Sequence, residues 1–87
     1  MSRVSGARVL LETDGRGFEL LLVEDTERGG RSVELWEIAP APGRGLLLEA
    51  FGSAGGQFTF SALTREDIPL EALEWFVGRA RATLTSD

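Results

Sequence analysis

The side chains of this chain that could do chemistry are carboxylates, hydroxyls and arginines. The 87 residues include 14 acidic and 9 basic residues, but no His, Cys or Tyr, and every basic residue is Arg, so Lys is absent as well. General acid–base and nucleophilic catalysis rely mainly on those four missing residue types. We therefore predict that the protein is not an enzyme. Any activity would have to use carboxylates together with a metal ion.

Two groups of carboxylates are dense enough to consider as sites. Glu24, Asp25 and Glu27 form an acidic cluster that could hold a hard cation, but their spacing does not match a calcium-binding loop, and a charged strand end is usually solvated. Glu66 and Asp67 are better explained as negative charge at a helix N-terminus. A glycosidase-type pair would need a substrate cleft, for which the chain has little room. We predict no catalytic residue, metal ion or cofactor.

The glycine-rich segments lie where turns are expected. They occur at residues 15–17, 43–45 and 53–56, each between two predicted strands. A loop that holds phosphate should instead run from a strand into the N-terminus of a helix. We interpret all three as turns.

One amphipathic helix with its cap is predicted over residues 64–84, and the helix itself is expected to start at Pro69 or within a residue of it. Thr64 and Asp67 are candidate capping residues. The spacing of apolar residues predicts a single buried stripe made of Leu70, Leu73, Phe76, Val77, Ala80 and Leu84. Trp75 lies off this stripe. It is either a boundary residue at the rim of a sheet or a contact for another chain, since Trp is enriched at interface hot spots.

The chain before the helix is predicted to form five strands, over residues 7–13, 18–25, 31–39, 46–52 and 57–63. Asp14-Gly15 and the other short turns between them indicate hairpins. The predicted fold class is α+β: a five-stranded antiparallel β-meander followed by one C-terminal helix packed on one face of the sheet. Residues 1–87 then form a single domain with a loose N-terminus at residues 1–6.

Side chains alternate between the two faces of a strand, so each face can be listed. In the last strand Phe58, Phe60 and Ala62 share a face, which we expect to meet the helix. The opposite face of the sheet would hold many apolar groups that one helix cannot cover: Leu10, Leu21, Val23, Trp36, Ile38, Leu47 and Phe51. Either the sheet curls and buries them on itself, or this face is an interface with a copy of the chain or another protein.

Binding of single-stranded nucleic acid is the main alternative. Trp36 and Phe51 could stack bases beside Arg8, Arg31 and Arg44. The order of elements is similar to that of small PC4-like proteins, which bind single strands as dimers, although this is an analogy of fold only. The net charge of −5, and the glutamates expected on the same face (Glu12, Glu19, Glu34 and Glu49), oppose phosphate binding.

The sequence therefore predicts a non-catalytic protein–protein interaction domain. We expect a homodimer that acts as a small acidic adaptor, regulator or inhibitor in a bacterial or phage pathway. Its partners would be itself, another protein or both, with nucleic acid less favoured and no membrane partner. No apolar run is long enough to span a bilayer, and residues 1–15 lack the apolar core of a signal peptide. These features predict a cytoplasmic protein.

Overall fold

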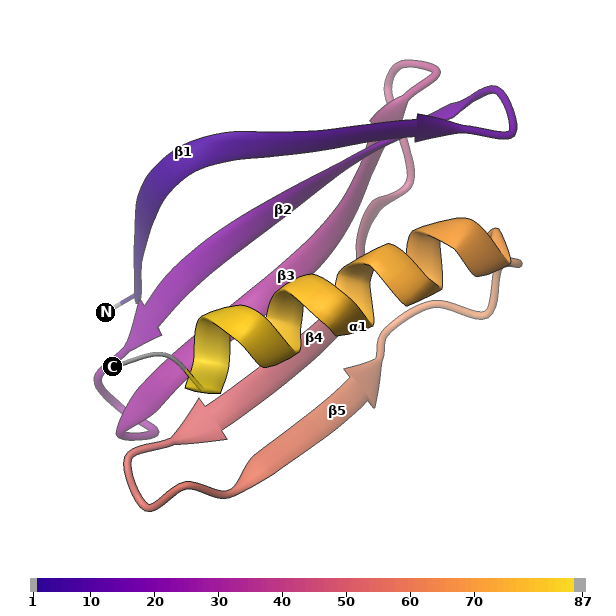
Figure 1. Ribbon diagram of the computed structural model, residues 1–87. Coiled ribbons are helices and arrows are strands. Elements are labelled where there is room, and N and C mark those ends of the chain that lie inside the picture. Colours follow the sequence, from indigo (N-terminus) through magenta and orange to yellow (C-terminus); the bar gives the residue numbers. More distant parts are fainter. Residues whose placement is uncertain (1, 86–87) are drawn as a thin grey trace.

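A computed structural model describes residues 2–85, with side chains from residue 9 onward. It contains five strands and one helix: β1 (Ser2–Thr13), β2 (Arg16–Asp25), β3 (Gly30–Ala39), β4 (Gly45–Ser53), β5 (Phe58–Ala62) and α1 (Leu70–Thr85). The strands form one antiparallel sheet in the order β1-β2-β3-β4-β5, and α1 crosses one face of it (Figure 1). The predicted α+β meander with one C-terminal helix is thus confirmed.

Tight turns account for this neighbour-to-neighbour order. Asp14 and Gly15 both have positive φ, at 56° and 69°, which is the backbone of the two-residue hairpin turn that Asp-Gly favours. β1 is longer than the sequence predicted: its backbone pairs with β2 from Ser2 onward, where a loose N-terminus was expected. An irregularity in this pairing lies between Ser5 and Val9.

The core lies between the helix and the middle of the sheet. Its buried members come from β2, β3, β4 and α1, and they are Phe18, Leu20, Val33, Leu35, Leu47, Leu48, Ala72, Phe76 and Ala80. The helix packs mainly over β3, with further contacts to β1 and β4. A helix with its side chains is about 10–12 Å wide, whereas five strands spaced about 4.8 Å apart span roughly 20 Å. The helix therefore leaves part of its own face of the sheet uncovered.

The buried side of α1 differs from the predicted stripe. The predicted members Leu70 and Val77 are 68% and 41% exposed, whereas Ala72, which was not predicted, is fully buried. Ala72, Phe76 and Ala80 are spaced four residues apart, and the two alanines allow the helix to approach the sheet closely. Compared with the predicted orientation, the helix is turned about its own axis, so that Ala72 faces the sheet and Val77 is exposed on the side toward β5. Trp75 packs against the core on the side of the helix away from β5.

Polar contacts fix the start of α1 to the β1–β2 hairpin. Arg16 Nη1 donates a hydrogen bond to the Asp67 carbonyl at 2.8 Å, and the Thr13 hydroxyl donates to Glu71. The predicted capping residue Thr64 acts earlier in the chain, where its hydroxyl accepts a bond from the Glu66 N–H. These contacts hold the first turn of the helix above the hairpin.

Candidate protein interaction surfaces

The apolar residues predicted on the open face, which is the side of the sheet away from α1, differ in exposure. Leu10 is 58% exposed, whereas Leu21, Trp36, Ile38 and Phe51 are about half-buried. Val23 and Leu47 are buried, and Leu47 belongs to the core. Trp75, the remaining predicted contact residue, packs against the core from the helix. Large apolar side chains of the open face are thus better covered than the sequence alone suggests.

Arg28 covers one of these apolar side chains, Phe51. Its guanidinium lies 4.3 Å from the centre of the Phe51 ring and forms ion pairs with Asp25 and Glu49 at 2.6 and 2.8 Å. The cross-strand register places Glu34 directly opposite Glu49, which is unfavourable for two like charges. Arg28 neutralises Glu49, and the Trp36 indole N–H donates to Glu34 at 2.9 Å. The hydrogen bond from Arg28 also lowers the pKa of Asp25.

Of the arginines proposed for nucleic-acid binding, Arg31 and Arg44 do not lie beside Trp36 and Phe51. Arg31 donates to the Thr83 carbonyl of α1, so its side chain extends to the helix-bearing face. Arg44 lies 3.9 Å from Glu37 and 3.5 Å from Glu66, near the start of the helix. The side chain of Arg8 lies outside the described residues. The open face instead presents Glu34 and Glu49 around Trp36 and Phe51, with Arg28 already paired to carboxylates.

The largest exposed apolar groups lie at the other end of the chain. Among the described residues six large hydrophobic side chains are exposed, and five of them fall between residues 58 and 77: Phe58, Phe60, Leu63, Leu70 and Val77. Every residue of β5 is exposed, because β5 is the last strand of the sheet and α1 does not lie over it (Figure 1). We call Phe58, Phe60 and Val77, which face the space between β5 and α1, the β5 rim.

Local contacts hold the two aromatic rings of the β5 rim in place. Phe58 pairs across the sheet with Gly52, and a Cβ added to Gly52 would lie 3.0 Å from the Phe58 ring. The Phe60 ring is tilted against Phe76 of the core, with 6.3 Å between the ring centres. The two rings lie on the helix-bearing face, but the expectation that this face would meet the helix is met only in part, because α1 does not lie over β5 and Phe60 meets the helix at the Phe76 ring. Phe58 remains 53% and Phe60 56% exposed, because each ring is covered on one side only.

A groove of about 370 Å³ runs between β5 and α1. Its walls are the β5 rim and Arg81, and Ala50, Phe76, Ala80 and Leu84 line it further. Apart from Arg81, Thr59 and Thr85 its lining is apolar, with no carboxylate among the lining residues. Such a surface is suited to apolar side chains of a protein partner. Sequence reasoning missed it because Phe58, Phe60 and Val77 were all assigned to the contact between helix and sheet.

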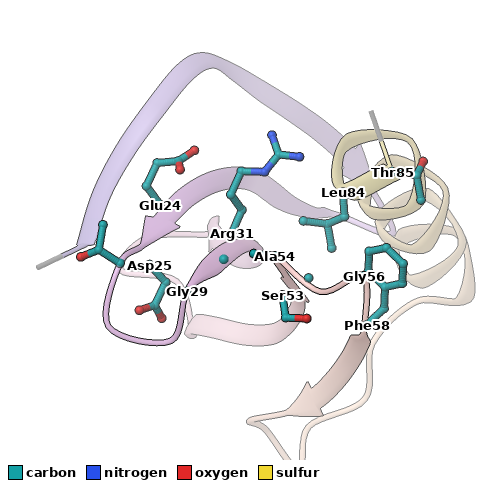
Figure 2. A pocket seen from close by; sticks show the side chains of 13 residues that line it. Glu24, Asp25, Gly29, Arg31, Ser53, Ala54, Gly56, Phe58, Leu84 and Thr85 are labelled. Carbon is teal, nitrogen blue, oxygen red and sulfur yellow. The ribbon is translucent and has the colours of Figure 1, made fainter. Parts of the chain in front are cut away.

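A larger open cavity of about 740 Å³ lies at the end of the sheet, below the last turn of α1. Figure 2 shows Arg31 extending between Glu24 of β2 and the helix end marked by Leu84 and Thr85. Glu24 and Asp25 of the predicted acidic cluster line this cavity, but within residues 2–85 no three carboxylates are grouped as a metal site would require. Asp25 in this lining is ion-paired with Arg28 at 2.6 Å.

Comparison of the chain with protein-family models, with curated proteins and with solved structures gives no significant match. Within the described residues, no helix has the length and apolar character needed to cross a membrane.

Proposed function

We propose that this protein is a non-catalytic interaction domain that associates with itself through the β5 rim. The observation that carries the proposal is the exposure of two neighbouring phenylalanines, Phe58 and Phe60, beside a helix residue, Val77, that is also exposed. Scattered single apolar residues are normal on a protein surface, but a contiguous group marks an interaction site. The absence of His, Cys, Lys and Tyr from the sequence supports a role that needs no catalysis.

The size of the surface sets the expected strength of association. A Phe side chain buries about 150–250 Å², so two half-exposed rings offer on the order of 200 Å² per copy. Val77, which is 41% exposed, adds to this apolar area on the same rim. The total is small beside the roughly 800 Å² per partner of a standard interface. We therefore expect a dimer with a dissociation constant on the order of micromolar.

Two substitutions of equally exposed residues test the surface. Phe60→Ser removes the centre of the β5 rim, and Leu10→Ser removes a residue of similar exposure on the open face. Sedimentation equilibrium should give Phe60→Ser a dissociation constant at least about tenfold higher than that of the parent, with Leu10→Ser close to the parent. Because Phe60 also touches Phe76, Val77→Ser serves as a second rim variant on the helix surface.

If Phe60→Ser and Val77→Ser both associate like the parent while Leu10→Ser does not, the interface is the open face and the β5 rim is the wrong surface. If the parent itself is monomeric throughout the micromolar range, self-association is wrong. Circular dichroism of each variant at the same concentration shows that its fold is retained.

A further inference from the structure

The two edges of the sheet are built differently. β1 carries Arg3, Arg8 and Glu12, and its pairing with β2 is irregular between Ser5 and Val9. β5 and its neighbours, residues 57–63, contain no charge and no proline, and the register of β5 with β4 is unbroken. Charges, prolines and bulges are the usual means by which edge strands avoid pairing with other strands. Among the described strands, β5 is the edge strand that lacks all three.

The hydrogen bonds to β4 determine which backbone groups face outward from β5. The Ser53 N–H donates to the Gln57 carbonyl, and the Leu63 N–H donates to the Leu47 carbonyl, both at 2.8 Å. Residues 57 and 63 therefore direct their backbone groups toward β4. Because these directions alternate along an antiparallel strand, Phe58, Phe60 and Ala62 direct theirs toward the free edge.

We propose that the free edge of β5 pairs with β5 of a second copy, antiparallel and about a two-fold axis at Phe60, to form one continuous ten-stranded sheet. This inference rests on the proposed function and specifies how the two copies meet. In this register Phe60 is opposite Phe60 of the second copy, and Phe58 is opposite Ala62. All three residues whose N–H and C=O groups face outward then find a hydrogen-bonding partner. With a two-fold axis at residue 59 or 61, one of these three residues would have no outward-facing residue of the second strand opposite it.

The side chains fit the same register. On the helix-bearing face, an aromatic pair forms at the axis, and on each side of it a large Phe58 meets a small Ala62. On the opposite face Thr59 is placed beside Ser61 of the second copy, where their hydroxyl groups can form a hydrogen bond. Both helices lie on the same side of the joined sheet, so the two grooves between β5 and α1 become one apolar trough. The neutrality of residues 57–63 allows two chains of net charge −5 to meet there.

Cross-linking through introduced cysteines tests the register, because the chain has no cysteine of its own. Thr59 and Ser61 are exposed and lie on the face away from α1, so Thr59→Cys and Ser61→Cys should fold like the parent. Directly opposite residues of a non-hydrogen-bonded pair have Cα atoms about 4.5 Å apart, within disulfide range. Thr59 of both copies, and likewise Ser61 of both copies, would be diagonal neighbours, beyond the roughly 7 Å limit. Thr26→Cys, in the exposed turn after β2, is the control.

Mild oxidation of Thr59→Cys mixed with Ser61→Cys should give a covalent dimer at least about five times faster than either variant alone or Thr26→Cys. Faster cross-linking of Thr59→Cys alone would overturn the axis at Phe60. A dimer by sedimentation without any cross-link at residues 59 and 61 would overturn strand pairing but leave self-association intact. A parent that stays monomeric would overturn both proposals.

Discussion

The guanidinium of Arg16 and the carboxylate of Glu37 form a two-pronged ion pair beneath the start of α1. Nε lies 3.0 Å from Oε2 and Nη2 lies 2.6 Å from Oε1, and the Glu37 side chain is only 3% exposed. The hydrogen bond from Arg16 lowers the pKa of Glu37, although burial acts in the opposite direction. The pair connects β2 to β3 and, through Arg16 and Asp67, to the segment that leads into the helix.

Glu37→Gln should lower the free energy of unfolding by about 2 kcal/mol at pH 7, since it leaves Arg16 without its main partner in a partly buried site. A carboxylate whose pKa is lower in the folded state contributes stability above its ordinary pKa near 4.5 and loses it as the pH falls further. Urea unfolding should therefore show a smaller difference between parent and variant at pH 3 than at pH 7.

The matched control for that measurement is Glu27→Gln. Glu27 lies in the exposed turn after β2, so its substitution should change stability by less than about 0.5 kcal/mol at either pH. An equal loss of stability in Glu37→Gln at pH 3 and pH 7 would contradict the assignment of the ion pair as a charge-dependent contact.

Arg28→Met should remove the charge that holds Asp25 ionised while keeping an apolar side chain over Phe51. The pKa of Asp25 is lowered mainly by its hydrogen bond to Arg28, so in the variant it should rise toward its ordinary value near 3.8. Carboxyl carbon shifts followed by NMR between pH 2 and 6 measure this change directly. An Asp25 titration that is the same in parent and variant would show that the ion pair does not persist in solution.

The rotation of α1 can be tested by two substitutions in its first turn. Ala72→Leu adds volume at a fully buried position and should cost about 1–3 kcal/mol of stability. Leu70→Ser alters a residue that is 68% exposed and should change stability by less than about 1 kcal/mol. Thermal or urea unfolding distinguishes the two. The reverse order of effects would place Leu70 in the core, as the sequence pattern predicted.

Trp75→Ala should destabilise the fold without weakening association. Trp75 packs against the core on the flank of α1 that faces away from the β5 rim, so the truncation leaves a gap costing on the order of 2–3 kcal/mol. Denaturant unfolding gives the stability, and sedimentation under native conditions gives the dissociation constant. If the dissociation constant rises while stability is unchanged, Trp75 is a contact residue for another chain.

The order and type of the elements could be predicted because their signals are local. Alternating apolar residues marked the strands, Asp14-Gly15 marked the first hairpin, and Pro69 marked the helix start one residue before Leu70. The rotation of the helix could not be predicted in this way. The rotation depends on the close packing of Ala72 and Ala80 against a sheet that is wider than the helix. This is a tertiary contact, and the spacing of apolar residues along the helix does not reveal it.

The candidate site was missed for the same reason. Phe58 and Phe60 were correctly placed on the helix-bearing face of the sheet. Both stay exposed because the helix is too narrow to cover that face as far as β5. Arg28 shows a second limit of sequence reasoning. Its contacts with Glu49 and Phe51 join residues 21 and 23 positions apart, and they depend on the register between β3 and β4.

Light scattering during size-exclusion chromatography, over at least a tenfold range of concentration, tests self-association through the β5 rim most directly. The parent should approach twice the mass of the 87-residue chain as concentration rises, while Phe60→Lys, which places a charge at the proposed axis, should keep the mass of one chain. A parent that remains at the mass of one chain, or a Phe60→Lys variant that dimerises as readily as the parent, would contradict the account.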